Sequence, residues 1–479
     1  MKVILVRPPD PRGEAAFLSH APPINLAYLA AFISQDGHEV EIWDYETEKF
    51  TKTGFINRIS QAKPRIIGYG CMTPTIINGH RMARLTKENF PQIMTVLGGP
   101  HSTAWPRRSL KDFPYFDTVV IGEGEETLLE LCRAIKTKRG VDGILGIAHK
   151  NAEGNIKTEE RRPLIENLDE LPFPRRDLLN LDLIRKGHIS RGISNRLAST
   201  EIYTSRGCPI GCLFCAIGVT MGRRTRFRSP ENVLAEVEEC IGRYGFGHFA
   251  VMDDTFTLNS DRAKKICEGF RKLGVKSWHC EGTRVSAVKP DLLKVMAETG
   301  CRKVVFGVES GSPRILELIG KKITIEQVKN AFRWARQAGI RFIEGNYIIG
   351  SHPSETLADL EMTMSLIKET QPDFISISII VPYPGTIVYD LMKKKGYILT
   401  ENWEKFVMID SLPSWRTEYF RPEELLNLQR KMLKSFYLRP NYIMSILSKI
   451  RSIKEMRYFT EAGSEFLHWL IKGKLAKII

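Results

Sequence analysis

The chain lacks a long hydrophobic run. Its longest nearly uninterrupted apolar stretch, Ala21 to Ile33, is shorter than the ~18 residues that a membrane-spanning helix needs. The N-terminus offers only a short apolar run before Arg7-Pro8-Pro9, too little for the core of a signal peptide. We therefore expect a cytoplasmic protein.

Cysteine is scarce as well. There are 9 cysteines in 479 residues, an odd number and a density too low for a disulfide scaffold. Disorder is excluded, because 43% hydrophobic and 26% charged residues are ordinary values for a globular protein. The length suits two or three domains of roughly 100–200 residues each.

Acidic residues are too few to balance the basic ones. Lys and Arg number 70 against 55 Asp and Glu, a net charge of +15. Residues 427–479 hold 11 of the basic residues and only 3 acidic ones. Because the excess is concentrated in this tail, we predict a partner for the tail and no general affinity for nucleic acid.

Strand and helix patterns alternate over the first part of the chain. Short apolar runs predict strands at 2–6, 40–43, 65–69, 93–97 and 118–121, and helices at 25–35 and 126–135. Such runs separated by helices are typical of a parallel sheet buried on both faces. We predict a Rossmann-like, doubly wound α/β sheet over residues 1–138. Such sheets bind ligands where their strands end, here at Gly98-Gly99-Pro100-His101 and Gly122-Glu123-Gly124-Glu125. Tight turns are the alternative explanation for these glycines.

A second alternating series follows a linker. Residues 139–195 are rich in charge and proline and are predicted to connect two domains, with a hairpin near 151–155. Strands are then predicted at 201–204, 249–252, 278–280, 303–308, 342–349 and 374–381. Six strand–helix units suit a partial (β/α)6 barrel of the TIM type over residues 196–395, with its chemistry on the loops that follow the strands. Residues 396–479 are predicted to form a basic, helical C-terminal region.

Three cysteines crowd into the loop after the first strand of the second series. Cys208, Cys212 and Cys215 follow the pattern Cys-x3-Cys-x2-Cys, and glycines at 207 and 211 permit a tight curl. A structural zinc site needs four ligands, and no nearby residue supplies the fourth. A [4Fe–4S] cluster held by three cysteines leaves one iron open, which is a catalytic arrangement.

This cysteine segment, with Phe214 before its last cysteine, resembles the signature of the radical S-adenosylmethionine (SAM) superfamily. The resemblance implies SAM contacts at Phe214, at Glu309 and Ser310 after the fourth strand, at Ile349 in the fifth, and at Arg284 near the end of the third. The usual Gly-Gly-Glu segment is replaced by Met252-Asp253-Asp254-Thr255-Phe256. We expect Asp253, Asp254 and His279 to form a satisfied polar rim.

One branch of that superfamily, the cobalamin-binding radical SAM enzymes, resembles almost the whole chain. The resemblance rests on the two glycine motifs, on Leu171-Pro172-Phe173-Pro174, on Asp253-Asp254 and on Pro382-Tyr383-Pro384-Gly385-Thr386. It implies that cobalamin binds at the following residues: Thr73, Gly98, Gly99, His101, Gly122 and Glu123. His38, in Asp36-Gly37-His38, is interpreted as a surface turn residue and not as a cobalt ligand.

The resemblance implies a C-methyltransferase that acts on an unactivated carbon with a 5′-deoxyadenosyl radical and methylcobalamin. The expected partners are a small-molecule or lipid substrate and an electron donor such as flavodoxin or ferredoxin. An oxidative cyclase or rearrangement enzyme with the same cofactors is the alternative. A tRNA methylthiotransferase would need three N-terminal cysteines, but only Cys71 and Cys132 precede the triplet. A non-enzymatic iron–sulfur or cobalamin carrier would leave the segments at Glu309 and Gly350 without a role.

Apolar residues recur at helical spacing in the basic tail, as at Ile443, Ile446, Leu447 and Ile450. A second apolar set extends over 466–475. Basic amphipathic helices of this kind bind anionic membranes, which would place the protein peripherally on the inner membrane face and would favour a lipid or isoprenoid substrate. The equally weighted alternative is that these helices pack on the barrel.

Overall fold

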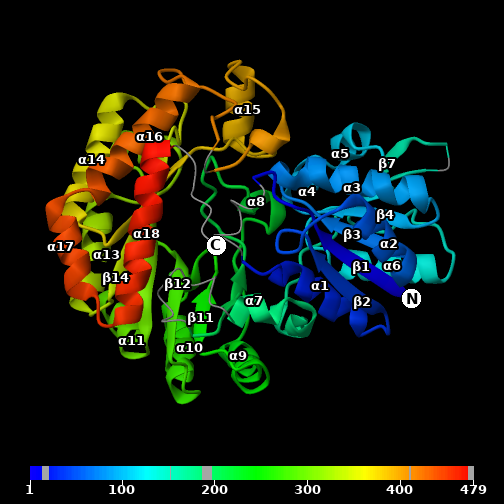
Figure 1. The fold of residues 1–479 in the computed structure, drawn as a ribbon, viewed down its shortest axis with the longest axis horizontal. Coiled ribbons are helices and arrows are strands. Elements are labelled where there is room, and N and C mark those ends of the chain that lie inside the picture. Colours follow the sequence, from blue (N-terminus) through cyan, green and yellow to red (C-terminus); the bar gives the residue numbers. More distant parts are fainter. Residues whose placement is uncertain (13–20, 152, 186–196, 409–410, 473–479) are drawn as a thin grey trace.

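We describe the protein from a computed structural model that defines residues 1–12, 21–151, 153–185, 197–408 and 411–472. Two sheets lie side by side in it, the N-terminal sheet in blue and a second sheet in green to yellow (Figure 1). The structure confirms the predicted fold class: a Rossmann-like sheet, a partial barrel and C-terminal helices.

The N-terminal sheet has seven strands. They are β1 (Lys2–Arg7), β2 (Glu39–Asp44), β3 (Ile66–Gly70), β4 (Met94–Gly98), β5 (Thr118–Val120), β6 (Ile147–Lys150) and β7 (Ile156–Thr158). Their order is β2-β1-β3-β4-β5-β6-β7, and β1 to β5 are parallel. The order reverses between β1 and β3, and open parallel sheets bind ligands where the strands end beside such a reversal.

Helices cover both faces of this sheet. They are α1 (Ile24–Ser34), α2 (Lys52–Ala62), α3 (Ile76–Asn89), α4 (Pro100–Ala104), α5 (Pro106–Asp112) and α6 (Glu125–Lys136). Val3 and Leu5 pack with residues of α1 and α6, whereas Ile4 and Val6 pack with α2 and α3. Burial on both faces explains why the strands are continuous apolar runs.

The first part of the predicted linker belongs to the N-terminal sheet. Its hairpin, β6 and β7, pairs antiparallel with β5 and extends the N-terminal sheet. Residues 147–158 therefore belong to that sheet. His38 also differs from the prediction: it is only 4% exposed, and burial lowers its pKa. It precedes β2 at the amino-terminal edge, opposite the edge where ligands of such a sheet bind.

The second sheet forms an open barrel. Its strands are β8 (Ser199–Ile202), β11 (His248–Val251), β12 (Ser277–Thr283), β13 (Cys301–Glu309), β14 (Phe342–Ile349) and β15 (Phe374–Ile379). They are parallel and pair in chain order, and β8 and β15 are its two edges. The outer helices are α9 (Pro230–Tyr244), α10 (Ser260–Lys272), α11 (Pro290–Glu298), α12 (Pro313–Leu318), α13 (Ile325–Gln337) and α14 (Leu357–Thr370).

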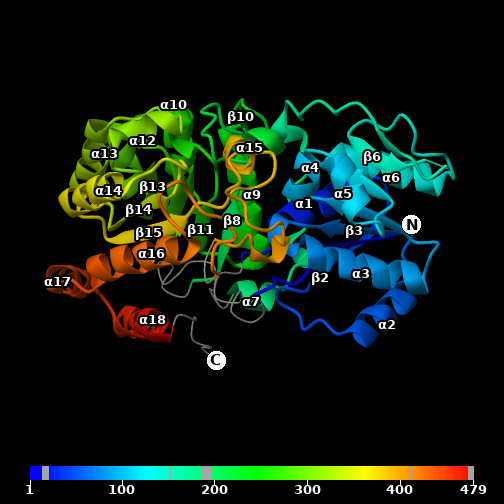
Figure 2. The ribbon, with the colours of Figure 1, turned by 90° about the horizontal axis from the view of Figure 1, so that it is seen from above.

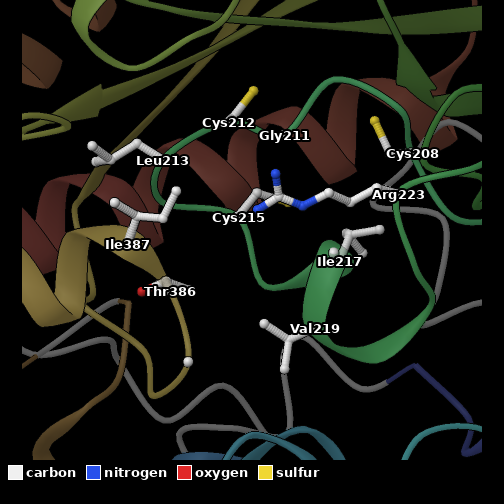
Figure 3. Close-up of a pocket in the computed structure, with 12 residues that line it drawn as sticks. Cys208, Gly211, Cys212, Leu213, Cys215, Ile217, Val219, Arg223, Thr386 and Ile387 are labelled. Atoms are coloured by element: carbon white, nitrogen blue, oxygen red, sulfur yellow. The ribbon is translucent and has the colours of Figure 1, made fainter.

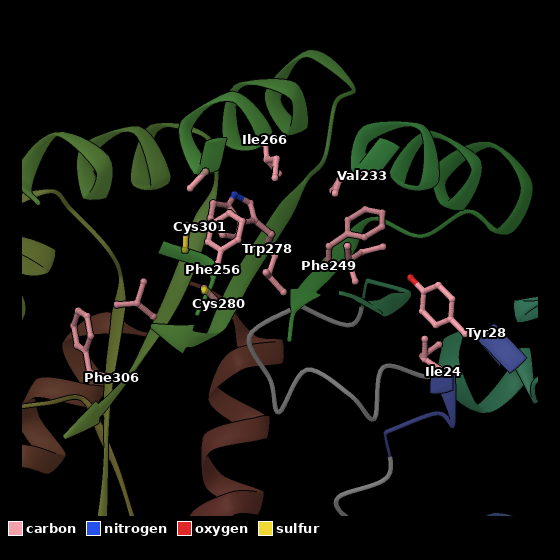
Figure 4. Close-up of a cluster of buried hydrophobic side chains, with 14 of the residues drawn as sticks. Ile24, Tyr28, Val233, Phe249, Phe256, Ile266, Trp278, Cys280, Cys301 and Phe306 are labelled. Atoms are coloured by element: carbon pink, nitrogen blue, oxygen red, sulfur yellow. The ribbon is translucent and has the colours of Figure 1, made fainter. Parts of the chain in front are cut away.

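The barrel strands alternate between an apolar outer face and a polar inner face. Phe249 and Trp278 pack outward beneath α10, which carries Ile266, and Tyr28 of α1 lies at the edge of the same core (Figure 4). Phe306 packs outward against Phe332 of α13, with 5.0 Å between ring centroids. The residues between these positions face the lumen, because successive side chains of a strand point to opposite sides. This polar lumen was not predicted.

The C-terminal part of the chain is helical. The helix α15 (Ile387–Lys394) packs toward the N-terminal sheet, with Tyr389 4.9 Å from Trp105 between ring centroids. The helices α16 (Pro422–Tyr437), α17 (Pro440–Lys449) and α18 (Ile453–Lys472) pack on the barrel. Figure 2 shows α16 to α18 against the barrel and away from the N-terminal sheet. Phe459 of α18 stacks on Phe374, and Glu455 binds Arg341 at 2.6 Å. The predicted apolar set at 466–475 falls partly outside the described residues. None of the described helices combines the length and apolarity that a membrane span requires.

Candidate cofactor site

The cysteine loop leaves the barrel after β8, through the short strand β9 (Ser205–Arg206). Gly207 has φ +88°, and a Cβ there would lie 2.3 Å from the carbonyl oxygen of Arg224. Only glycine tolerates that conformation and that contact. The Cys215 N–H donates to the Cys212 carbonyl at 3.0 Å, so the last two cysteines belong to one turn.

Asp253 anchors the start of this loop. Its carboxylate accepts bonds from the N–H groups of Thr204 and Ser205 at 2.5 and 3.2 Å and from the Ser205 hydroxyl at 2.7 Å. Gly282 makes room for it, since a Cβ there would lie 1.5 Å from the Asp253 carbonyl oxygen. Asp253, which was predicted to lie in a polar rim, is thus a buried residue that fixes the start of the cysteine loop.

The end of α12 and the segment before α15 hold the middle of the loop. The Leu213 N–H donates to the Ile319 carbonyl at 3.0 Å, and the Val388 N–H donates to the Leu213 carbonyl at 3.1 Å. The three cysteines line a pocket together with Thr386, Ile387 and residues of α8 (Ile217–Thr220) (Figure 3). The Pro382–Thr386 motif therefore builds the wall opposite the thiols.

Cys208, Cys212 and Cys215 offer three thiols on one loop. A structural zinc site is normally held by four protein ligands, one more than the loop's three cysteines. Three free thiols on one glycine-bearing loop fit an iron–sulfur cubane.

Charged groups surround this pocket. Burial raises the pKa of Cys212; Lys321 and Arg284 act to lower it, and Glu309 acts to raise it. Glu309 binds the Lys321 ammonium at 2.6 Å and has φ +72°, a strained conformation for a residue with a side chain. Arg284 donates to the carbonyls of Lys321 and Lys322 at 2.6 Å. The structure thus brings the predicted Arg284 and Glu309 to the cysteines and adds Lys321, which no sequence pattern indicated.

Three other residues with an expected SAM contact are buried to different extents. Ser310 is completely buried, and its hydroxyl accepts a bond from the Ser312 N–H at 3.2 Å. Ile349 is 1% exposed inside the core between strands and helices. Phe214 is half-buried and packs against both hydrophobic cores. Contact of these three residues with SAM stays a prediction.

The carboxyl edge of the N-terminal sheet faces open space at two predicted glycines. A Cβ at Gly98 or Gly122 would meet no atom of the described residues within 4 Å, and Met72, which follows β3 beside Gly98, is 52% exposed. Gly99, in contrast, has φ +116°, and a Cβ there would lie 2.2 Å from the Cys71 carbonyl oxygen. This edge therefore offers bare backbone to a flat, bulky ligand, as cobalamin requires.

Thr73 and His101 lie beneath that edge. His101 Nδ1 lies 3.3 Å from the Thr73 hydroxyl, and both residues are buried. Burial lowers the pKa of His101 to about 4, so the ring is neutral at pH 7. His101 packs edge-on against Trp105 and Trp403. These residues form the floor of the edge.

Glu123, a predicted cobalamin contact, is already engaged. Its two carboxylate oxygens accept from Arg206 and Arg226, each at 2.7 Å, and Glu125 binds the same Arg206 at 2.7 Å. Arg206 lies two residues before Cys208, so the Gly-Glu-Gly-Glu motif clamps the cysteine loop to the N-terminal sheet. Burial alone would raise the pKa of Glu123, but Arg226 and Arg206 outweigh it, and the pKa is lowered.

A second buried network joins the two domains beside this clamp. Arg176, 1% exposed, donates to Glu236 at 2.6 Å and to the Glu201 carbonyl at 2.8 Å. Arg228 donates to the other oxygen of Glu236 at 2.5 Å, and the hydroxyl of Tyr28 on α1 lies 3.4 Å from that oxygen. The proline-rich segment before Arg176 delivers this side chain into the interface.

We predict that Glu123→Gln destabilises the protein by about 3–5 kcal/mol at pH 7, because it leaves the buried Arg226 guanidinium with backbone carbonyls only, among the described residues, while Arg206 keeps Glu125. A carboxyl whose pKa is lowered by folding stabilises the protein above its unfolded value of 4.5, and this contribution is lost as the pH falls through the folded pKa. In urea unfolding, the free energy of unfolding of Glu123→Gln should therefore lie below that of wild type by the full amount at pH 7, and this difference should shrink below pH 4.5.

The matched control is Glu126→Gln, because Glu126 is exposed and binds Arg162 at the surface. It should change the urea midpoint little. Equal midpoints for the two variants at pH 7 would contradict the clamp.

Comparisons with known proteins agree with this geometry. The family model of the Radical SAM superfamily matches residues 202–367, and that of the B12 binding domain matches residues 15–132. An uncharacterized methyltransferase of Pyrococcus horikoshii is 36% identical over 93% of this chain and 94% of its own length. The anaerobic magnesium-protoporphyrin IX monomethyl ester cyclase of Rubrivivax gelatinosus is 27% identical over 97% of this chain and 83% of its own.

A solved structure shares the fold. The cobalamin-dependent S-adenosylmethionine radical enzyme OxsB, with aqua-cobalamin and S-adenosylmethionine bound, matches 98% of this chain and 72% of its own, with a TM-score of 0.73 at 17% identity. The cofactors of this chain are a [4Fe–4S] cluster, SAM and cobalamin. The chain belongs to the cobalamin-dependent radical SAM enzymes.

Proposed function

We propose that this enzyme is a C-methyltransferase that acts on an unactivated carbon of a small molecule. One observation carries the proposal: the three-thiol loop is clamped by Arg206 directly to the sheet edge where Gly98 and Gly122 leave open space. When bound, the cluster and SAM supply a 5′-deoxyadenosyl radical, and cobalamin supplies the methyl group.

The chain's own residues position these groups and exclude water. Cys208, Cys212 and Cys215 would hold the cluster, and the positive charge of Arg284 would bind the SAM carboxylate. Glu309, kept in its strained conformation beside Lys321, would bind the ribose or amino group of SAM. Radical chemistry needs orientation and a dry site more than it needs an acid or base.

The edge of the N-terminal sheet would bind cobalamin through backbone at Gly98, Gly99 and Gly122, above Thr73 and His101. Glu123 would act indirectly, because its carboxylate holds Arg206 and Arg226. We assign it to positioning the cluster loop. An electron donor of the flavodoxin or ferredoxin type would supply the reducing electron.

A cyclase with the same cofactors is the second candidate, and the similarity to the Rubrivivax enzyme favours it. Methyl transfer produces S-adenosylhomocysteine and 5′-deoxyadenosine together, whereas a cyclase forms no homocysteine product during turnover. The tRNA methylthiotransferase finds no support, because Cys71 and Cys132 are separately buried core thiols.

Our prediction for the cluster concerns iron and SAM cleavage. Reconstituted wild-type protein should hold about four iron atoms per chain, the content of one cubane. Serine at any of Cys208, Cys212 or Cys215 should abolish the iron–sulfur absorbance and reductive formation of 5′-deoxyadenosine, because each sulfur is one of only three protein ligands. Cys240→Ala, which removes a buried thiol of α9 outside the loop, should keep both. Undiminished cleavage in the triple serine variant would refute the assignment.

We also propose peripheral membrane contact through α17 and α18. The helices dock on the barrel, as the alternative to the membrane interpretation predicted, yet they keep exposed apolar residues on their outer surface. Met444, Leu447 and Ile453 are 67%, 54% and 80% exposed, and Arg451 lies between the helices. Exposed apolar and basic side chains on neighbouring helices bind anionic headgroups and acyl chains.

Co-sedimentation with phosphatidylglycerol vesicles tests this contact. The double variant Met444→Glu/Ile453→Glu should remain in the supernatant, because it replaces the two most exposed apolar residues with anions. Leu357→Glu, at a 51% exposed position on α14, is the matched control and should pellet like wild type. Equal pelleting of all three proteins, or of none, would refute membrane contact.

A further inference from the structure

The barrel lumen carries a continuous chain of polar side chains that the cofactor site does not use. Ser277 Oγ lies 2.7 Å from His248 Nδ1, and His248 Nε2 lies 2.7 Å from His279 Nδ1. His279 Nε2 in turn lies 3.2 Å from Glu281 Oε1. This chain crosses β11 and β12 on their inner faces.

The chain continues onto the next two strands. The Lys303 ammonium on β13 donates to Glu281 at 2.8 Å and to Glu344 of β14 at 3.1 Å. Burial lowers the pKa of both His248 and His279, so the two rings are neutral at pH 7. Two carboxylates therefore share one ammonium group, and the cluster carries a net negative charge.

Charged groups on neighbouring elements also act on this chain of side chains. Glu201 on β8 is a further carboxyl, whose pKa burial raises to about 7. Arg7 and Arg176 act on Glu201 but are bound at 2.6 Å to Asp44 and Glu236 respectively. Arg302 acts on His248, at the opposite end of the chain of side chains from Glu344. At Glu281 and Glu344 the described residues thus supply two carboxylates and one ammonium group, and an unbalanced carboxylate attracts a cation.

One polar atom beside the cluster lacks a partner. Asn346 follows Glu344 on the same face of β14, and its buried Oδ1 finds no hydrogen-bond partner among the described residues. It pairs in register with Gly307, which has no side chain, and with Ser376 of β15. Buried amide oxygens are almost always bonded, so this one points to a donor that the described residues do not supply.

The position adjoins the charged residues that surround the cysteines. Ser376 and Ser378 on β15 are half-buried, whereas Ile375, Ile377 and Ile379, which alternate with them, are buried in the same hydrophobic cluster as residues of α16. A Cβ at Gly307 would lie 2.8 Å from Glu309 Oε1 and 3.0 Å from Lys321 Nζ. Glu344 and Asn346 pair in register with Val305 and Gly307, which precede Glu309 on β13. Together with Glu281, they therefore lie deeper in the lumen than the Glu309 assigned to SAM.

We propose that Glu281, Glu344 and Asn346 bind an ammonium or guanidinium group of the methyl acceptor, so that the substrate is a polar, cationic small molecule and not a hydrocarbon lipid. This inference rests on the proposed function, because it names the substrate of the same site. An isoprenoid chain would leave the Oδ1 atom of Asn346 without a donor and would place apolar surface against charged side chains, both of which are unfavourable.

Calorimetric titration of the cofactor-loaded enzyme with three small probes tests the proposal: n-butylammonium, 1-butanol and pentanoate. Butylammonium should bind with a Kd at least about tenfold lower than either other probe, as expected for a charge-assisted hydrogen bond. Glu344→Gln should raise that Kd about tenfold. Asn346→Lys, which places an ammonium group in the site, should abolish binding of butylammonium.

Glu326→Gln, on the exposed side of α13, is the matched control and should bind butylammonium like wild type. Equal affinity for the three probes, or unchanged binding in both lumen variants, would overturn the proposal. Cofactor absorbance and 5′-deoxyadenosine formation are recorded in the same samples. If they are intact while butylammonium does not bind, only the substrate class is wrong, whereas their absence from wild type would refute the proposed function itself.

Discussion

The site depends on one buried ion-pair cluster, in which Glu123 and Glu125 of the N-terminal sheet hold Arg206 of the cysteine loop. Arg206 lies two residues before the first thiol, so its position fixes the beginning of the loop, and Asp253 fixes the same segment from the barrel side. A guanidinium held by two carboxylates is strongly oriented. Two domains that share a hydrophobic cluster thus present the thiols and the glycine edge to one another.

Charge is arranged in layers along the barrel. Arg284, Lys321 and the Glu309 that binds Lys321 lie near the cysteines at the mouth of the barrel. Glu281, Lys303 and Glu344 lie deeper, and these three side chains together carry one net negative charge. The outer faces of the same strands are apolar and pack under the helices. Alternation along each strand therefore separates a hydrophobic core, which stabilises the barrel, from a polar lumen.

Local patterns predicted the elements well, because each strand is a short apolar run between turns. The strand at 342–349 and the helix at 230–244 have the bounds expected from the sequence. The cysteine triplet was equally clear, since its ligands are close in the chain. Partners distant in the chain were not predictable: the contacts of Glu123 come from residues 83 and 103 positions away. The same holds for Lys321, for the lumen cluster and for the hairpin that joins the N-terminal sheet.

Hydrogen–deuterium exchange of wild type and Arg206→Met tests the clamp most directly. Because the clamp joins two loops from different domains, loss of Arg206 should raise the exchange of residues 122–128 and of residues 207–216 together, while β13 in the barrel core keeps its protection. Unchanged exchange at 122–128, with a change confined to the cysteine loop, would contradict the account, since it would mean that the N-terminal sheet does not hold the loop in place.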